Sequence, residues 1–318
     1  MVETVHQPVL LDEVLTGLAV RAGSVCVDAT LGGGGHTEAL LSASAPDGRV
    51  LGVDRDPDAL ARTGARLAPF GSRFVPAHGN FADLLEVAGA HGFSDVDAIL
   101  MDLGVSSDQL DTPARGFSFR FEGPLDMRMD TTRGPTAAEW LAEASEVEIA
   151  DVIFRFGEDR ASRRIAKAIV RARAEAPLTG TLALAELVER AVGGRKGARI
   201  HPATRTFQAL RMVVNEELDS VTRGLTAALA LLKPGGRLGV ITFHSLEDRL
   251  VKQFFRRHEG REVSLYEGGS EWQGDLPRVQ RVNRKPVTAD EAERSLNPRA
   301  RSAKLRVIAK GHDHGNQA

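Results

Sequence analysis

The sequence predicts an α/β protein whose parallel sheet is interrupted by an all-helical insertion. Short apolar runs alternate with helical patterns through the first hundred residues, which is typical of βαβ units. From Thr136 to about Leu231 the pattern is almost entirely helical, and a strand pattern then returns at 237–243. We therefore expect sheet segments at 1–110 and 216–318 on either side of a helical insertion at 111–215.

The first part of the sheet is predicted from four apolar runs separated by helical patterns. Asp56 stands directly before one of these helices, where its carboxylate can cap the first turn. We expect strands at 24–28, 49–54, 74–77 and 96–103, and helices at 37–44, 57–67 and 81–90.

The insertion carries two capping boxes, Thr136-Ala-Ala-Glu139 and Ser145-Glu-Val-Glu148, each of which predicts a helix start. An amphipathic helix is expected at 159–174. Beyond the insertion, the pattern predicts a helix at 246–257 and a last strand at 305–308, whereas 260–295 has no clear periodicity.

Composition indicates an ordinary globular protein of the cytoplasm. The 318 residues include 42% hydrophobic and 26% charged residues. A single cysteine, Cys26, excludes an intrachain disulfide and fits a reducing compartment. We expect no signal peptide, because the N-terminus has no charged region followed by an apolar one. We expect no membrane partner, because no apolar run approaches the ~18 residues of a span. The nine histidines lack zinc-site spacing, so no metal is expected.

Positive charge is concentrated in two zones. Residues 159–211 hold 12 Lys and Arg against 4 Asp and Glu, and residues 277–310 hold 10 against 3. Such zones on a chain of net charge −2 favour a polyanionic partner such as nucleic acid. Solvated helix faces are the alternative.

Four consecutive glycines, Gly32 to Gly35, follow the strand that ends in Asp28. Glycines cost backbone entropy and pack nothing, so this loop indicates a close approach of the main chain to a ligand. In a doubly wound sheet that ligand lies at the carboxyl ends of the strands. Asp54 ends the next strand, at the spacing of an acid that holds a ribose. The pattern therefore favours an adenosine-containing cofactor.

The kind of cofactor is less sharply defined. A phosphate-binding P-loop requires Lys after the glycines, but the chain has His36 and Thr37. The dinucleotide frame fits poorly, since Thr37 stands where a third glycine belongs. S-adenosylmethionine is favoured, because Asp28 offers an acid to its ammonium group. NAD and a purely structural glycine turn stay open.

Asp102 ends the fourth predicted strand, where a carboxylate would lie beside the reactive end of the cofactor. A carboxylate that accepts an N–H from an exocyclic base amine localises the nitrogen lone pair for methyl transfer. Capping of the following turn is the alternative role. His244 follows the strand at 237–243 and should reach the same sheet edge. A serine hydrolase is disfavoured, because no Gly-x-Ser-x-Gly elbow is present.

An ordered set of motifs sharpens this interpretation. The motifs are HQPVLLDE (6–13), DATLGGGGH (28–36), DRDP (54–57), HGNF (78–81), DLGVSS (102–107), RGFSF (115–119), GPLDMRMD (123–130), HPATRTFQ (201–208), FHSLEDR (243–249) and NPRARS (297–302). Together the motifs closely resemble the bacterial 16S rRNA (cytosine-N4)-methyltransferase family, also called RsmH or MraW. The resemblance covers nearly the whole chain and thins out over about 260–295.

The resemblance implies a Rossmann-like class I S-adenosylmethionine methyltransferase sheet and methylation of a cytidine N4 amine in the decoding region of 16S rRNA, within the small subunit. In that family the second glycine of the loop is often replaced by another residue, and in this chain it is Gly33. We expect Asp102, Ser106 and His244 to be catalytic. Cofactor contacts are expected from Asp28, Gly33, Gly34, Gly35, His36, Asp54, Phe81, Asp102 and Gln109. Phosphate contacts are expected from Arg160, Arg164, Lys167, Arg171, Arg205, Arg299 and Arg301.

Several alternatives remain. Methylation at C5 needs a cysteine nucleophile, and Cys26 lies in an apolar strand, so direct attack by an amine is favoured. Phe117 and Phe119 either stack on a flipped base or belong to the core. His6 either folds over the site or makes a local contact. A non-catalytic RNA-binding assembly factor and a NAD-dependent oxidoreductase are the rival functions, and the sequence leaves monomer and homodimer open.

Overall fold

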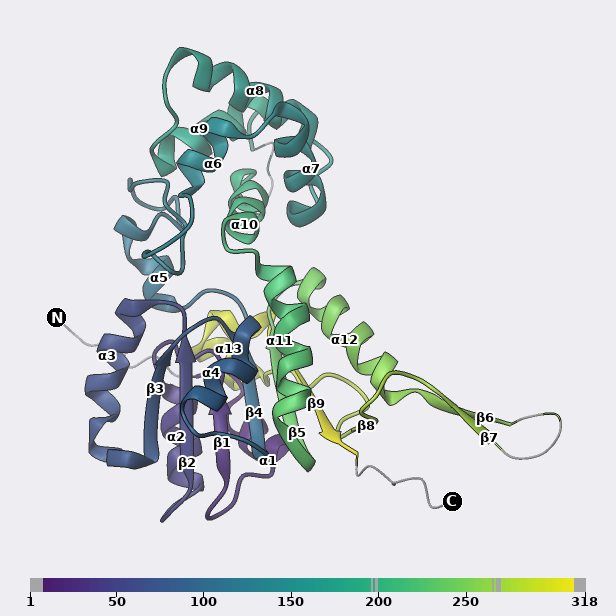
Figure 1. Cartoon of the computed structure of the whole chain (residues 1–318). Coiled ribbons are helices and arrows are strands. Elements are labelled where there is room, and N and C mark those ends of the chain that lie inside the picture. Colours follow the sequence, from purple (N-terminus) through teal and green to yellow (C-terminus); the bar gives the residue numbers. More distant parts are fainter. Residues whose placement is uncertain (1–7, 196, 198–199, 265, 267–269, 312–318) are drawn as a thin grey trace. The chain divides into compact units, whose positions relative to one another are not determined.

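The computed structural model describes residues 8–195, 197, 200–264, 266 and 270–311 (Figure 1). The chain forms two compact units, here called the sheet unit and the helical unit. The sheet unit comprises Met1–Gly104 and Leu218–Ala318, and the helical unit comprises Val105–Glu217. The helical unit thus begins a few residues before the expected insertion and ends shortly after it.

The sheet unit is built on one seven-stranded sheet. Its strands are β1 (Val25–Asp28), β2 (Arg49–Asp54), β3 (Phe74–His78), β4 (Val96–Asp102), β5 (Leu232–Thr242), β8 (Val279–Arg281) and β9 (Lys304–Lys310). Its helices are α1 (Leu11–Leu18), α2 (Gly35–Ala43), α3 (Pro57–Leu67), α4 (Leu84–Ala90), α11 (Glu217–Leu231), α12 (Ser245–Glu259) and α13 (Glu291–Leu296).

The strand order β3-β2-β1-β4-β5-β9-β8 creates a switch point at the centre of the sheet. Strands β1 to β5 are parallel, and β9 pairs antiparallel with both β5 and β8. The chain winds from β1 toward β3 in one direction and from β4 toward β5 in the other. A crevice for ligands is therefore expected where β1 and β4 end side by side.

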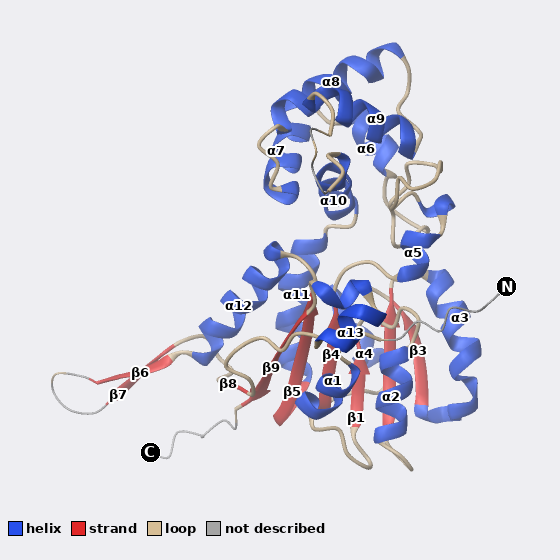
Figure 2. Ribbon diagram, turned by 180° about the vertical axis from the view of Figure 1, so that it is seen from behind, coloured by secondary structure: helices blue, strands red, loops and turns tan. Residues whose placement is uncertain are grey.

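Both faces of the sheet are buried, which explains why its strands are nearly continuous apolar runs. Val27, Ile99 and Val240 point into one core with α4 and α11. On the other face, Leu100 and Ile241 point into a second core with α1 and α2. Figures 1 and 2, which view the molecule from opposite sides, show these helix layers on either face.

The strands confirm most of the sequence-based expectations. β2 and α3 have the expected bounds, and the Asp56 side chain accepts a hydrogen bond from the Asp58 backbone N–H. Residues 233–236 form a bulge within β5, because Val96 pairs with Leu232 while Ala98 pairs with Arg237. The segment 260–295, which showed no periodicity, contains β6 (Arg261–Ser264), β7 (Ser270–Gln273), β8 and α13.

The helical unit packs its helices around a core of its own. The two expected capping boxes begin α6 and α7, with both reciprocal hydrogen bonds present. Removing either box should cost about 0.5–2 kcal/mol of helix stability. The helices are α5 (Ser107–Asp111), α6 (Ala137–Glu143), α7 (Glu146–Gly157), α8 (Ser162–Glu175), α9 (Thr181–Val192) and α10 (Ala203–Val214).

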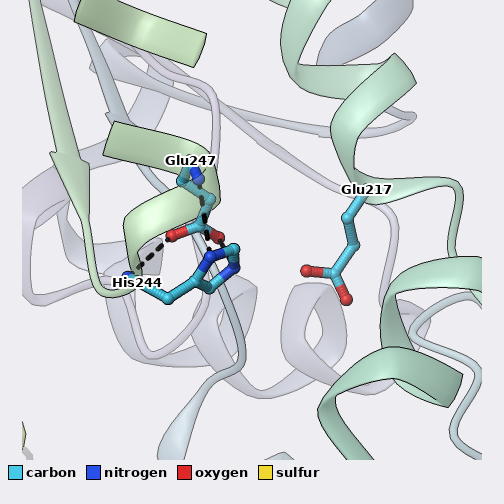
Figure 3. A group of neighbouring side chains, drawn as sticks. All are labelled: Glu217, His244 and Glu247. Atoms are coloured by element: carbon cyan, nitrogen blue, oxygen red, sulfur yellow. Dashed lines mark hydrogen bonds and ion pairs between the residues drawn. The ribbon is translucent and has the colours of Figure 1, made fainter. Parts of the chain in front are cut away.

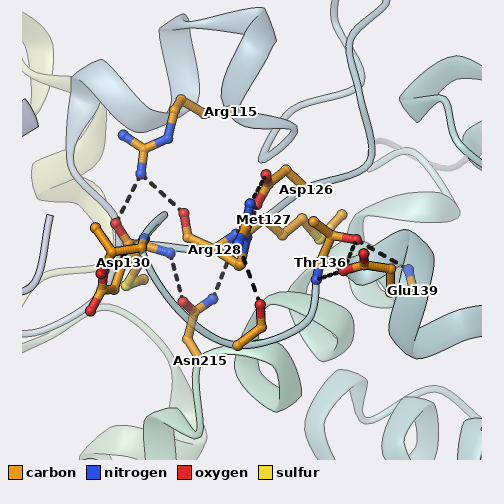
Figure 4. A network of polar contacts seen from close by, with 11 residues as sticks. Arg115, Asp126, Met127, Arg128, Asp130, Thr136, Glu139 and Asn215 are labelled. Carbon is orange, nitrogen blue, oxygen red and sulfur yellow. Dashed lines mark hydrogen bonds and ion pairs between the residues drawn. The ribbon is translucent and has the colours of Figure 1, made fainter.

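A polar network holds the irregular segment before α6 (Figure 4). The buried Asn215 amide donates to the Met127 carbonyl at 2.7 Å and accepts from the Met129 N–H at 2.8 Å. Arg115 donates to the carbonyls of Arg128 and Met129, each at 3.0 Å. These contacts support Met127 at φ 61°, a backbone conformation that side chains rarely adopt.

Cys26 is buried in β1, as expected. Burial, assisted by the negative charge of Asp97, raises the pKa of its thiol to about 12. Because the thiolate is the reactive form, we expect a thiol reagent at pH 8 to leave the native protein unmodified and to label one thiol after denaturation. Rapid labelling of the native chain, measured by absorbance or mass, would contradict this.

Among the residues described, no helix combines the length and the apolar character needed to cross a membrane.

Candidate active site

Three carboxylates end neighbouring strands of the sheet unit. Asp28 ends β1, Asp54 ends β2 and Asp102 ends β4. Strands β1 and β4 lie side by side, with Asp28 in register with Leu100. The sheet thus brings together the three acids that the sequence singled out, at the switch point.

The glycine loop between β1 and α2 is anchored to Asp54. The Gly32 N–H donates to one oxygen of this carboxylate at 2.7 Å, and the Asp56 N–H donates to the other at 2.8 Å. Thr63 donates its hydroxyl to the Gly32 carbonyl at 2.7 Å. Burial raises the pKa of Asp54, although these backbone N–H groups oppose the shift. An ionised carboxylate has about four acceptor positions, so Asp54 retains acceptor capacity.

Gly33 and Gly34 have different surroundings. Gly34 adopts φ +74°, and a Cβ there would come within 2.3 Å of the Thr63 side chain. Gly33 is exposed, and a Cβ there would meet nothing within 4 Å. The loop therefore depends on glycine at position 34, whereas Gly33 borders open space.

Asp28 is buried and accepts hydrogen bonds from residues on both sides of the four glycines. Its carboxylate accepts the Thr37 hydroxyl at 2.7 Å and the Thr30 N–H at 3.1 Å. Burial raises its pKa to about 6 despite these hydrogen bonds. Its expected contact with a cofactor ammonium group stays a prediction.

Asp102 is the acid with the most unusual environment. Its Oδ1 atom is buried and has no hydrogen-bond partner among the described residues, although 27% of the side chain is exposed. Its Oδ2 atom lies 3.8 Å from Nε2 of His36, which is buried in the first turn of α2. Burial, followed by the negative charges of Asp28 and Glu247, raises the pKa of Asp102 to about 8. A carboxyl that changes protonation near neutral pH is suited to proton transfer.

His244 lies where β5 passes into α12, as expected, but both nitrogens of its ring already contact Glu247 (Figure 3). Its Nδ1 accepts the Glu247 N–H at 3.4 Å, and its Nε2 lies 3.0 Å from Oε1 of Glu247. The other Glu247 oxygen accepts the Phe243 N–H at 3.0 Å. The sequence-based set omits the buried Glu247, although its spacing three residues after His244 is that of a capping box.

The remaining predicted site residues are distributed over both units. Phe81 is half-buried and lies against α11, where a Cβ on Gly224 would come within 2.6 Å of its ring. Ser106 and Gln109 belong to the helical unit and form the capping box that begins α5. The catalytic role of Ser106 and the cofactor role of Gln109 stay predictions. His6 lies outside the described residues.

The expected phosphate contacts also belong to two units. Lys167, Arg164 and Arg171 are exposed on α8, and Arg160 is exposed just before it. Arg163, which is not in the expected set, is also exposed on this helix. The adjacent arginines Arg163-Arg164 are the sequence feature that could have identified it.

The other three expected contacts are separate from α8. Arg205 lies exposed on α10, with one guanidinium nitrogen 3.3 Å from the Glu158 carbonyl. Arg299 and Arg301 lie in the sheet unit, in the turn Pro298–Arg301.

Phe117 and Phe119 belong to the core of the helical unit. Phe117 is buried, and the Phe119 ring packs 4.8 Å from the rings of Phe207 and His201. The structure therefore favours packing over base stacking for this pair.

The sheet order, the antiparallel β9, the glycine loop at the switch point and the acids at the ends of β1, β2 and β4 define a class I S-adenosylmethionine-dependent methyltransferase. A sequence model of the MraW methylase family matches residues 3–311. The chain therefore belongs to the MraW methylase family.

Three relatives named "Ribosomal RNA small subunit methyltransferase H" are similar over almost their whole length. The protein from Thermomicrobium roseum is 50% identical, with 98% of this chain and 95% of the relative covered. The protein from Syntrophotalea carbinolica is 52% identical, covering 95% and 97%. The protein from Geobacter sulfurreducens is 50% identical, covering 96% and 98%.

Proposed function

We propose that this chain transfers the methyl group of S-adenosylmethionine to the N4 amine of a cytidine in 16S rRNA of the small ribosomal subunit, in the cytoplasm. The observation that carries the proposal is the family match across residues 3–311, together with relatives named for small-subunit rRNA methylation. The partly exposed carboxyl of Asp102 at the switch point supports a reaction centre there.

The residues at the switch point fit this cofactor. Asp54 has acceptor capacity for ribose hydroxyls. The buried Oδ1 of Asp102 lacks a donor that a ligand could supply. Phe81 is proposed to complete the adenosine contacts. The cofactor supplies a methyl group on a positively charged sulfur, which an amine can displace in line.

Asp102 is proposed to act on the amine. Its carboxylate accepts an N–H of the cytidine N4 group, which localises the nitrogen lone pair and orients it toward the methyl group. After the transfer, the excess proton on N4 passes to Asp102. A pKa near 8 lets this carboxyl accept the proton and then lose it to water. His36, 3.8 Å away, orients the carboxylate.

The exposed face of α8 is proposed to hold the rRNA backbone. Arg164 and Lys167 are three residues apart, and Arg171 follows four residues later, so all three share one face. Their only carboxylate within 4 Å among the described residues is Glu175, 3.8 Å from the largely exposed Arg171. Such cations bind phosphates by charge.

The proposed function is tested by methyl transfer from tritiated S-adenosylmethionine to small ribosomal subunits that lack the modification. The expected result is N4-methylcytidine as the labelled nucleoside. Label on another nucleoside, or no label with either mature subunits or assembly intermediates, would overturn the proposal.

The loop glycines provide a matched pair of variants. Gly34→Ala should lower the free energy of unfolding by about 1–3 kcal/mol, because it combines a positive φ with a contact of 2.3 Å. It should also weaken cofactor binding at least tenfold, since the loop must shift. Gly33→Ala should bind the cofactor within about threefold of the wild type and stabilise the fold by ~0.4–1 kcal/mol. Calorimetry measures the cofactor affinity, and urea unfolding measures the free energy of unfolding. If the two variants had the same affinity and the same stability, the different roles assigned to Gly33 and Gly34 would be wrong.

A further inference from the structure

A small hollow lies on the sheet unit, among residues of α12 and β9 and residues in and just after β8. Figure 2 shows these three elements next to one another. The hollow is lined by Lys252, Phe255, Arg281, Asn283, Arg306 and Val307. None of these residues belongs to the set expected from the sequence. Three of the six side chains are cationic, which makes the hollow a candidate for an anion.

One edge of α12 faces β8 and β9 through residues at helical spacing. Asp248, Lys252, Phe255 and Glu259 stand at i, i+4, i+7 and i+11, so they share one side of the helix. The two carboxylates are at the ends of this row and Lys252 is between them. The net charge of the hollow therefore depends on which cations pair with those two carboxylates.

Both carboxylates are already occupied by cations. Asp248 accepts from Arg306 at 2.8 Å and from Lys304 at 3.3 Å. Partial burial disfavours ionisation of Asp248, but the hydrogen bond and charge of Arg306 and the charge of Lys304 outweigh it and lower its pKa. Glu259 lies 2.6 Å from Arg281. The pairing leaves no carboxylate for Lys252.

Lys252 has no carboxylate within 4 Å among the residues described, and its side chain is exposed. Lys252 lines the same hollow as Arg281 and Arg306, and these two arginines are already paired with Glu259 and Asp248. Like charges held together at a surface repel each other unless an anion joins them. The excess positive charge and the exposed position both favour an anionic ligand here.

The sheet register relates this hollow to the catalytic edge. Asp102 pairs with Ile241 of β5, and Ile241 pairs with Leu305 of β9. Two strand spacings of about 4.8 Å place the β9 backbone on the order of 10 Å from that of Asp102. Lys304 and Arg306 flank Leu305. The hollow is thus within reach of nucleotides that adjoin one bound at Asp102.

We propose that the hollow formed by Lys252, Arg281 and Arg306 binds a backbone phosphate of the rRNA, close to the target cytidine. This inference rests on the proposed function, because that function supplies a polyanion at this edge of the sheet. An RNA phosphate can accept from Lys252 while Arg281 and Arg306 keep their carboxylates and present further N–H donors. The contact fixes the register of the RNA and carries no sequence information.

The test compares Lys252→Glu and Lys252→Ala with a control variant, Arg21→Glu. This control reverses the charge of an exposed side chain that lies just before β1, at the opposite end of the sheet. Binding to unmodified small subunits is measured between 50 and 200 mM salt on the full-length protein. Lys252→Glu should weaken binding about tenfold at low salt, and Lys252→Ala should reduce the salt slope by about one contact. Arg21→Glu should bind like the wild type. Calorimetry with S-adenosylmethionine should show unchanged affinity for all three variants.

Four results would overturn the inference. If both Lys252 variants bind the RNA as tightly as the wild type, the hollow is not part of the RNA-binding surface. The proposed function would still stand in that case, provided that the wild type transfers the methyl group. Equal losses in Arg21→Glu would show a general charge effect. Lys252-dependent binding of inorganic phosphate without any effect on RNA would assign the hollow to a free phosphate. A wild-type chain that neither binds nor methylates small-subunit RNA would overturn both proposals together.

Discussion

Replacing Asp102 by Asn should lower kcat for methyl transfer to small-subunit RNA by about 10²–10⁴-fold. Asparagine keeps the shape of the side chain but cannot take up the proton from N4. A tritium-transfer assay at saturating RNA and cofactor measures the effect. Retention of wild-type kcat would remove Asp102 from the reaction.

The same variant should be more stable than the wild type at pH 8. Because the pKa of Asp102 is raised from 3.8 to about 8, the folded state binds this proton more tightly than the unfolded state. Wild-type stability therefore falls as pH rises from about 4 to about 8, and Asn removes that loss. Replacing this buried charge by a neutral side chain of similar volume should therefore stabilise the fold at the higher pH. Urea unfolding at pH 5 and pH 8 should show the gain mainly at the higher pH.

Asp97 is the matched control at the other end of β4. Its carboxylate binds Lys233 and accepts the Val25 N–H at 2.8 Å. Partial burial opposes ionisation, but these hydrogen bonds and the Lys233 charge lower its pKa. Its stabilising contribution is present above pH 3.8 and is lost only in more acidic solution. Asp97→Asn should thus destabilise the fold at pH 7 and leave kcat unchanged, the opposite of Asp102→Asn in both respects.

Reversing two charges on α8, Arg164→Glu with Arg171→Glu, should weaken RNA binding about a hundredfold at low salt and spare cofactor binding. Two lost phosphate contacts should also reduce the salt slope by roughly 1.4, the value for single-stranded nucleic acid. Filter binding at several salt concentrations, with calorimetry for the cofactor, measures both.

The double variant Arg164→Lys with Arg171→Lys serves as its control. Lysine keeps the charge on the same helix face, so RNA binding should stay within a few-fold of the wild type. Unchanged RNA affinity in the glutamate variant would show that α8 presents a solvated face.

The acids of the active site could be predicted because each one ends a buried strand. The runs before Asp28, Asp54 and Asp102 are apolar on both faces of the sheet, so their ends are visible in the sequence. Parallel strands then bring those ends to one edge. The raised pKa of Asp102 was not predictable, since it depends on burial and on the nearby charge of Glu247 from a distant helix.

The missed elements lack local signals. Helix α1 begins after Leu10 at φ 56° and ends at Ala19 at φ 51°, and no side chain caps its first turn. The strand β6 has no apolar alternation, because it pairs with β7 along one edge and neither of its faces is buried in a core. Lys252 gains its significance only from β8 and β9, which bring Arg281 and Arg306 to it.

The position of β9 has a consequence for how the sheet unit forms. This strand lies between β5 and β8 although it is the last in the chain, and β5 itself follows the helical unit of more than a hundred residues. During synthesis β1 to β4 can pair early, whereas β5 has one unpaired side until β9 has been made. Local contacts let the helical unit fold meanwhile, which shortens the loop that must close before β5 joins β4. The acids at the ends of β1, β2 and β4 can thus come together before β5 and β9 complete the sheet.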